Sequence, residues 1–479
     1  MSENRNMKFD LNKQNRKEIL ETVMDKLEYF YDNTKNFPTT PSIDVIKIRE
    51  FVDKQDLKVG GDYRAAIDHV TTGLEKYSVH TPHPKYFGLY NPRSNYAGII
   101  SDLISAYYNP QLAAWSHAPF AVEVEAKLIK EFAGKFGYAP AQSDGVFATG
   151  GNEANQTAVL CALNNKYANY ARDGLISVVK KPIIFCSEEA HHSVHKAAKT
   201  SGLGYDCVKS IPTDTNLKLD TILLEKEINT AYARDEDPLM IIGTAGTTGT
   251  GTVDDLARIN EIAEKHNIWF HVDAAYGGAA MLSSNLKKQM SGIERSNSIT
   301  FDAHKWMSVP MGASIFLTSD PQILDKTFNI STEYMPKDAD ELEIVDPFSH
   351  SIQWSRRFIG LKIYMSLLFY GWDGYDEIIS NQAKMGDFLR KKLTDNGWTI
   401  MNKSYLPVIC FSDEGYASDK NFTNVILERI YQKSQSWLSV YPVQNIRAFR
   451  VCISNYNTTE HELDELVSEL NFERENYFG

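Results

Sequence analysis

Apolar residues near the start of the chain repeat at spacings of three and four. This period predicts a helix over about residues 1–33, which ends where Asn36, Phe37 and Pro38 interrupt the pattern. A stripe this wide has to be buried, either on the body of the chain or on a second subunit. The residues of the stripe are Leu20, Val23, Met24, Leu27, Phe30 and Tyr31.

Between about residues 80 and 320, short apolar runs alternate with amphipathic stretches. The pattern predicts strands at 146–149, 183–187, 239–244, 268–273, 298–301 and 314–318, and helices at 155–171, 193–199 and 255–266. Continuous apolar strands that alternate with helices favour an α/β fold with a mostly parallel sheet covered on both faces. In such sheets, ligands bind at the carboxyl ends of the strands.

The last part of the chain has a different organisation. A long helix is predicted at 356–368, and a smaller α/β unit follows from about residue 375, with strands at 408–411 and 449–453. We therefore expect an N-terminal helical segment over 1–80, a large domain over 81–355, and a helix with a small C-terminal α/β domain over 356–479.

Composition and charge narrow the possible functions. A net charge of −12 argues against a general nucleic-acid binder. The five cysteines form no CxxC pair, which favours a reduced, cytoplasmic compartment and gives no reason to expect a metal site. The polar N-terminus does not resemble a signal peptide, and no apolar run of 18 residues predicts a membrane span.

The strongest chemical signal is Lys305, which follows the predicted strand 298–301 within Asp302-Ala303-His304-Lys305-Trp306. A lysine at the end of a buried strand points into a ligand crevice. Lysine is also the residue that forms Schiff bases with carbonyl compounds. The alternative is a lysine that faces bulk solvent, and the position after a predicted buried strand argues against it.

A second signal is Asp273, which ends the predicted strand 268–273. A carboxylate there is costly unless it has a partner, and the N–H of a pyridinium ring is a suitable one. A helix N-cap is the alternative. The small side chain of Ala275 leaves room for a flat ring. Since Lys305 lies one strand–helix–strand step further on, both side chains can reach one crevice.

Three further strand ends carry candidate ligand groups. Gly150, Gly151 and Asn152 follow a strand and open a helix, whose N-terminus can bind a phosphate. The adjacent His191 and His192 also follow a strand, and either imidazole could cover a flat cofactor ring or contact a substrate carboxylate. A histidine at an ordinary helix start is the alternative. Thr247 could hold the phenolic oxygen of such a cofactor or pack beside its ring.

Taken in order, these motifs resemble the group II amino-acid decarboxylases, which depend on pyridoxal 5'-phosphate (PLP). The resemblance runs from about His80 to the C-terminus. It implies the PLP-dependent transferase fold type I, with a seven-stranded type of sheet in the large domain. It also implies a carboxy-lyase acting on a small amino-acid substrate, and a homodimer with the N-terminal helix as a clasp between subunits.

Position by position, the resemblance makes Lys305 the Schiff-base lysine, Asp273 the partner of the ring nitrogen, and His191 rather than His192 the stacking residue. Tyr334 falls where the family has a tyrosine that returns a proton to the substrate α-carbon. Arg357 matches an arginine near the active site of the aromatic members. The resemblance further places Gly151, Asn152 and His304 at the phosphate, and Ala275 and Thr247 beside the ring.

The sequence favours an aromatic substrate, because an apolar wall could be built from Tyr86, Phe87, Tyr90 and Trp115. Plain core packing is the alternative for these four side chains. A glutamate or aspartate substrate, with Lys85 or Arg93 as its anion partner, and a diamino acid remain open. So does an aminotransferase or carbon–carbon lyase in which Arg450 holds the α-carboxylate. A scaffold without catalysis is the remaining hypothesis.

Overall fold

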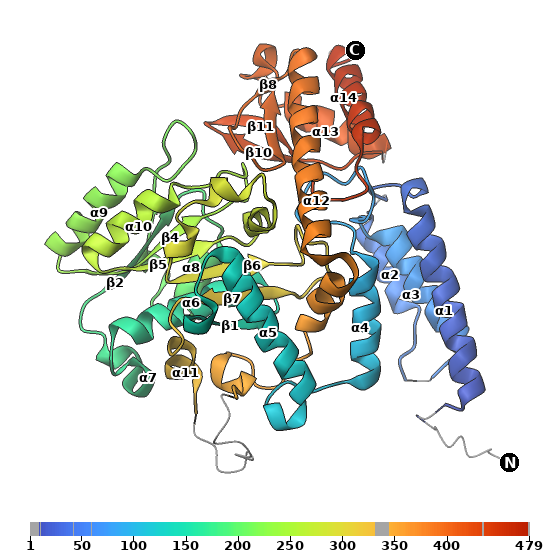
Figure 1. Ribbon diagram of the computed structural model, residues 1–479. Coiled ribbons are helices and arrows are strands. Elements are labelled where there is room, and N and C mark those ends of the chain that lie inside the picture. The colour runs from blue at the N-terminus through green and yellow to red at the C-terminus, as the bar shows by residue number, and fades with distance from the viewer. Residues whose placement is uncertain are drawn as a thin grey trace.

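The computed structural model describes residues 9, 11–41, 43–58, 60–330, 344–433 and 435–477. Figure 1 shows a large domain built on a sheet, a smaller sheet domain above it, and helices of the N-terminal segment along one side. The long helix α12 (Gly360–Asp395) runs from the large domain into the small one.

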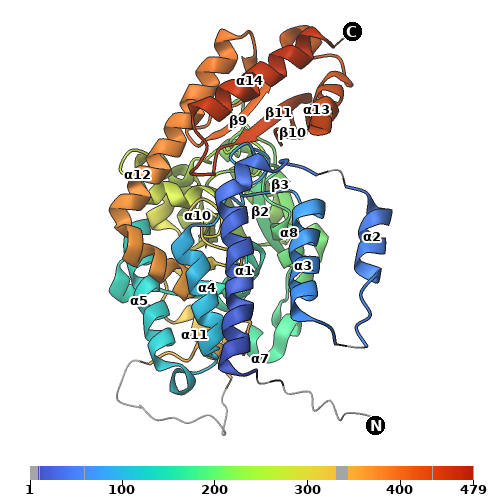
Figure 2. The ribbon, with the colours of Figure 1, turned by 90° about the vertical axis from the view of Figure 1, so that its right-hand side faces the viewer.

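The N-terminal segment consists of helices α1 (Lys13–Asn33), α2 (Val45–Asp53) and α3 (Tyr63–Tyr77). Figure 2 shows α1 lying along the body beside α4 (Tyr96–Tyr108), with α2 outermost. None of the described residues of α1, α2 or α3 is buried. The predicted helix over 1–33 is thus present from Lys13, and its apolar stripe is only partly covered by this chain.

The large sheet has seven strands in the order β1-β7-β6-β5-β4-β2-β3. Neighbours among β3, β2, β4, β5 and β6 run parallel, whereas β7 is antiparallel to both β6 and β1. The mostly parallel sheet and all six predicted strands are confirmed. The strands are β1 (Asp144–Ala148), β2 (Pro182–Ser187), β3 (Val208–Ile211), β4 (Asp237–Thr244), β5 (Trp269–Asp273), β6 (Ser298–Asp302) and β7 (Ser314–Thr318).

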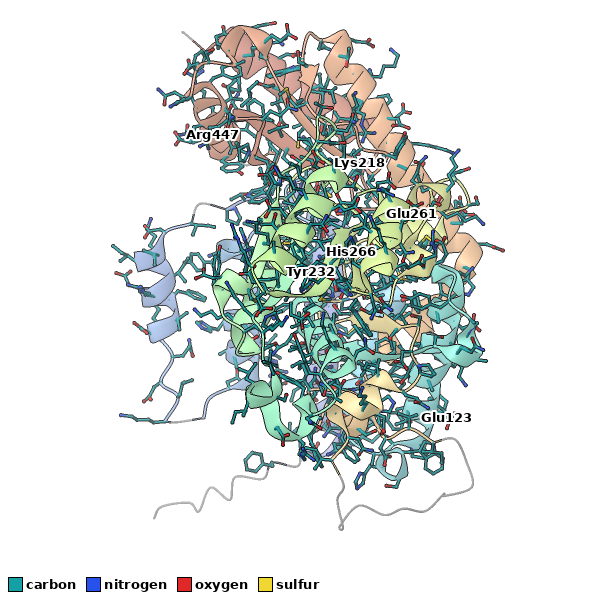
Figure 3. All side chains as sticks on the ribbon, turned by 90° about the vertical axis from the view of Figure 1, so that its left-hand side faces the viewer. Glu123, Lys218, Tyr232, Glu261, His266 and Arg447 are labelled. Carbon is teal, nitrogen blue, oxygen red and sulfur yellow. The ribbon has the colours of Figure 1, made fainter. Side chains whose placement is uncertain are left out.

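Helices cover both faces of this sheet, as its apolar strands require. One core cluster packs under α6 (Gly151–Lys166), α8 (Ser193–Thr200) and α11 (Ile323–Phe328), and the other under α5 (Pro119–Phe136), α9 (Thr221–Ala233) and α10 (Leu256–His266). Tyr232 of α9 and His266 of α10 stack on the outer face, with ring centroids 5.9 Å apart (Figure 3).

Two predicted helices differ from the structure at their ends. The helix expected at 155–171 begins earlier, at Gly151, and is divided into α6 and the short α7 (Tyr170–Asp173). The helix expected at 356–368 begins at Gly360 and continues to Asp395 through a kink at Gly371, whose φ of +64° suits glycine. No helix within the described residues has the length and apolar character needed to cross a membrane.

The small domain is an antiparallel sheet in the order β10-β11-β9-β8, backed by helices. Its core also includes Phe87, whose N–H donates to Trp437 O and whose carbonyl accepts from Cys452 N. A segment that precedes the large sheet in sequence therefore packs in the small domain. Its elements are β8 (Thr399–Ile400), β9 (Val408–Ser412), β10 (Ser439–Val443), β11 (Ile446–Cys452), α13 (Phe422–Lys433) and α14 (Glu460–Glu475).

Candidate active site

A cavity of about 230 Å³ lies at the carboxyl ends of β4, β5 and β6. The topology brings these ends together with the start of α6 and the turn before α8, so residues far apart in sequence share one space. Six of the eight residues predicted to bind the cofactor line the cavity, namely Gly151, Asn152, His191, Asp273, Ala275 and Lys305.

Lys305 lies in the turn after β6, with its amine facing a carboxylate from the same strand end. Its Nζ is 3.0 Å from Asp302 Oδ2 and 5.7 Å from the centre of the Tyr90 ring. Asp302 is 2% exposed and also accepts a hydrogen bond from the Ser314 hydroxyl. The buried carboxylate thus holds the amine at the wall of the cavity, where it can meet a carbonyl group.

Asp273 is almost buried at the end of β5, and each of its oxygens accepts one hydrogen bond. Asn155 Nδ2 donates to Oδ2 at 2.9 Å, and the N–H of Ala275 donates to Oδ1 at 3.1 Å. An ionised carboxylate can accept more than two hydrogen bonds, so it retains capacity for a donor in the cavity. Asn155 belongs to the motif that begins at Gly150, but its role beside Asp273 was not predicted.

The first turn of α6 forms another part of the cavity lining. Gly151 and Asn152 occupy its first two positions, where backbone N–H groups have no acceptor one turn earlier in the helix. Space here is restricted, because a Cβ at Gly151 would lie 2.9 Å from Asp302 Oδ2. Free N–H donors and minimal bulk suit a phosphate group.

The His191 ring is held in one orientation by the residue that begins α8. Its Nδ1 accepts a hydrogen bond from the Ser193 N–H at 3.1 Å and lies 2.8 Å from the Ser193 hydroxyl. Burial lowers the pKa of His191, and the nearby Lys305 lowers it further, while Asp273 opposes the shift. A neutral imidazole at the cavity wall can lie against a flat ring. His192 is not among the residues that line the cavity.

Two predicted cofactor residues lie behind the lining rather than in it. The Thr247 hydroxyl is 2.9 Å from that of Thr250 and accepts from the N–H of Thr252, within its own loop. His304 is held by the backbone of Ala313, and burial lowers its pKa. Their contacts with a cofactor stay predictions.

Of the five predicted substrate residues, Tyr90 lines the cavity. Its ring packs on Tyr276, with centroids 4.0 Å apart, and Tyr276 also lines the cavity although the sequence analysis did not select it. The other four lie elsewhere in this chain. Tyr86 stacks on Trp437, Phe87 is in the small-domain core, the Trp115 indole donates to Glu123, and Arg357 is on the surface beside Asp102.

Arg450, the candidate for binding a substrate carboxylate in an aminotransferase, is directed into the protein. It is 3% exposed, its Nε donates to the carbonyls of Thr248 and Gly249, and its guanidinium lies 4.9 Å from the Tyr90 ring centre. It supports the loop and the tyrosine that form the wall of the cavity.

The two candidate partners for an acidic substrate are also engaged elsewhere. Lys85 forms ion pairs with Glu465 at 2.7 Å and Glu469 at 3.5 Å, both on α14. Arg93 is packed on the Tyr31 ring, 3.6 Å from its centre. Tyr334, the predicted proton donor, lies outside the described residues.

Comparisons with known proteins identify the family of this site. The family model described as the pyridoxal-dependent decarboxylase conserved domain matches residues 54–414. The chain belongs to the pyridoxal-dependent decarboxylases. Its cofactor is PLP, and its reaction is the decarboxylation of an amino acid, so the resemblance found in the sequence is confirmed.

Relatives in this decarboxylase family act on chemically different amino acids. An aromatic-L-amino-acid decarboxylase of Bacillus atrophaeus is 25% identical over 98% of this chain and 97% of its own length. An L-2,4-diaminobutyrate decarboxylase of Acinetobacter baumannii is 28% identical over 90% of this chain and 87% of its own length. The structure of Oryza sativa TDC with PLP and tryptamine has a TM-score of 0.91 at 21% identity, covering 98% of this chain and 100% of that one, and shows fold type I.

The donors and acceptors of the cavity fit PLP. A phosphate matches the first turn of α6, a pyridinium N–H matches Asp273, and an aldehyde matches the amine of Lys305. The residues that offer these three groups line the same cavity, so a single ligand can contact all of them.

Proposed function

We propose that this decarboxylase acts on an aromatic L-amino acid of the phenylalanine, tyrosine, tryptophan or DOPA type. The observation that carries the proposal is the aromatic wall formed by Tyr90 and Tyr276 beside Lys305. Aromatic faces bind another ring in offset or edge-to-face geometry and add affinity beyond apolar burial. The aromatic substrate named for the Bacillus atrophaeus relative supports it.

In this proposal the cavity residues would hold the cofactor and the substrate. The first turn of α6 would bind the phosphate, Asp273 would accept the ring N–H, and Lys305 would hold the cofactor covalently. His191 would lie over the ring or against the substrate carboxylate. PLP, when bound, would supply an acceptor for the electron pair that remains when CO2 leaves. Tyr334 would supply a proton to the substrate α-carbon. We expect Tyr334→Phe to reduce amine formation.

A panel of amino acids assayed for CO2 release tests the substrate. We expect turnover with at least one aromatic amino acid and much less with glutamate, aspartate and 2,4-diaminobutyrate. Lys305→Ala is the control, which should release no CO2 and should retain no cofactor after borohydride reduction. Inactivity of the wild-type enzyme on every aromatic amino acid would contradict the proposal.

The alternative substrates have less support from the cavity. Among the described lining residues the only lysine or arginine is Lys305, which is committed to the cofactor. An acidic substrate would need a second cation, and both candidates are bound elsewhere. An aminotransferase would need Arg450 at the substrate, whereas its Nε donates to carbonyls of the loop at 248–249.

We also propose that the enzyme is a cytoplasmic homodimer. An apolar cavity of about 320 Å³ opens between α4 and α5, and Tyr107, Tyr108 and Phe120 beside it are 67%, 83% and 68% exposed. Large exposed apolar patches mark interaction sites, and a second copy is the occupant we propose. Sedimentation should give a dimer, and an active monomer would overturn this assignment.

The proposed cytoplasmic location rests on the cysteines. The five cysteines are free and buried, as a reducing compartment permits.

A further inference from the structure

Asn155 occupies a buried position between the two sides of the cofactor cavity. It lies one turn into α6, is 2% exposed, and touches residues of β5, β6 and the start of α8. Its amide makes all four hydrogen bonds that an asparagine can make. Nδ2 donates to Asp273 Oδ2 at 2.9 Å and to Ser193 Oγ at 2.8 Å, while Oδ1 accepts from Thr300 Oγ1 at 2.7 Å and from His271 Nε2 at 3.1 Å.

The partners determine which way this amide points. An ionised carboxylate only accepts hydrogen bonds, so the nitrogen of Asn155 has to face Asp273. The oxygen then faces Thr300 and His271, which must both donate to it. A reversed amide would place two acceptors against each other at 2.9 Å, where both side chains are largely buried.

His271 continues this chain of donors away from the cavity. Burial lowers its pKa to about 4, so the ring is neutral and carries a single N–H. That hydrogen is on Nε2, because Nε2 donates to Asn155. Nδ1 therefore accepts from the Ser298 hydroxyl at 2.8 Å, and Ser298 Oγ in turn accepts from the Trp269 indole at 2.9 Å. Every donor in the series is directed toward Asp273.

The second N–H of Asn155 reaches the other face of the cavity. It donates to the Ser193 hydroxyl, which is thereby left to donate its own hydrogen to His191 Nδ1 at 2.8 Å. The Ser193 N–H also donates to that nitrogen at 3.1 Å. His191 consequently carries its ring hydrogen on Nε2. One side chain thus connects the predicted ring-nitrogen partner with the predicted stacking histidine.

We propose that Asn155 is a positioning residue that holds the Asp273 carboxylate toward the cofactor ring nitrogen and, through Ser193, fixes the His191 tautomer. The inference does not depend on which amino acid is the substrate. It rests on the proposed pairing of Asp273 with the ring nitrogen. If the inference is right, a substitution at position 155 weakens cofactor binding only when the cofactor has its ring nitrogen.

The test compares two cofactors in the full-length enzyme. Apoenzyme is titrated with PLP and with deazapyridoxal phosphate, in which carbon replaces the ring nitrogen. Asn155→Asp puts a second carboxylate beside Asp273 at nearly constant volume. We expect it to bind PLP roughly ten- to hundredfold more weakly, as for a lost charge-assisted hydrogen bond, and the deaza analogue within about threefold of wild type. In the PLP form, the pH titration of the visible absorbance band should shift as well.

Asn164→Ala is the matched control, because Asn164 is buried on the same helix and its amide donates only within it, to Leu160 O. It should change both affinities equally or not at all. Equal losses of both cofactors in Asn155→Asp, or no loss of PLP, would overturn the inference. If that variant does not fold, Asn155→Ser, which shortens the side chain and loses the bond to Asp273, is judged in the same way.

Asp273→Asn in the same comparison separates the inference from its premise. If Asp273→Asn weakens both cofactors equally, the pairing of Asp273 with the ring nitrogen fails, and the inference fails with it. If Asp273→Asn discriminates between the cofactors while Asn155→Asp does not, the pairing stands and only the role of Asn155 is wrong.

Discussion

Where α6 begins, the two carboxylate oxygens of Asp302 decide which residue can occupy position 151. The Asp302 carboxylate approaches the Gly151 backbone closely and also pairs with the Lys305 amine. Any side chain at 151 would push this carboxylate away from the lysine. Neighbouring Gly150 is extended, with a φ of −171°, and a Cβ there would meet nothing within 4 Å.

We therefore expect Gly151→Ala to weaken PLP binding roughly tenfold or more, since overpacking of a fixed site costs on the order of 1–3 kcal/mol. Gly150→Ala is the control and should bind PLP as wild type does, because its methyl group has room. Fluorescence titration of the two apoenzymes with PLP measures the difference. Equal affinities in both variants would show that Asp302 can move without consequence.

Among the elements, α5 supports the start of α12 through one buried carboxylate. Glu125 accepts from Arg356 Nη2 at 2.6 Å and from the Gly360 N–H at 2.9 Å. The side chains of this ion pair are 4% and 6% exposed. Helix α12, which connects the two domains, begins at Gly360 rather than at 356, and the N–H of this first residue is satisfied by Glu125.

Glu125→Gln should lower the free energy of unfolding by about 3 kcal/mol, because it leaves the Arg356 charge buried and uncompensated. Urea unfolding monitored by circular dichroism measures the change. On the same helix, the exposed pair of Glu131 and Lys127 provides the control. Glu131→Gln should cost less than about 0.5 kcal/mol. Similar losses in both variants would contradict the special role of Glu125.

Sequence patterns predicted the bounds of a strand best where both of its faces are buried. The run Ser314–Thr318 was predicted residue for residue, because each of its side chains is buried. β3 was missed, since Lys209 and Ser210 are exposed on this short edge strand. Among the helices, the start of α6 was predicted too late, at Asn155, because Gly150 and Gly151 have a low helix propensity.

Residues that line the cavity could be predicted where chemistry and strand position coincide, as for Lys305 and Asp273. Asn155 was missed because its importance arises from partners on three other elements, which no local pattern reveals. Phe87 was expected at the substrate because it is aromatic and near Tyr90 in sequence. Its side chain instead enters the small-domain core, because its backbone is hydrogen-bonded to Trp437 and Cys452 of that domain.

On the scale of the whole molecule, His83 connects the N-terminal segment to the rest of the chain. Its Nδ1 lies 3.1 Å from the Thr39 hydroxyl, which itself donates to Gln435 O in the small domain. The His83 ring is 5% exposed, and burial lowers its pKa to about 4. Protonation of this histidine therefore opposes the packing of the N-terminal segment.

Stability should fall as pH is lowered from about 6.5 toward 4. In that window the unfolded chain protonates His83 while the native chain does not, which costs up to about 1.4 kcal/mol per pH unit. His83→Gln should lower stability at pH 7.5 but reduce its loss between pH 7.5 and 5. Thermal midpoints across this range measure both effects. His461→Gln, at an exposed histidine, is the control. An equal reduction of the loss in both variants would show that the burial of His83 is not its cause.

The position of β7 between β6 and β1 has a consequence for biosynthesis. β1 lies at the sheet edge and pairs with β7, so its pairing cannot be completed until residue 318 has been synthesised. At 5–20 residues per second, that delay is roughly 10–30 s. The apolar edge of β1 is open during this time, and such edges invite aggregation. A nascent chain that stalls before Ser314 would therefore expose this edge to chaperones and to other chains.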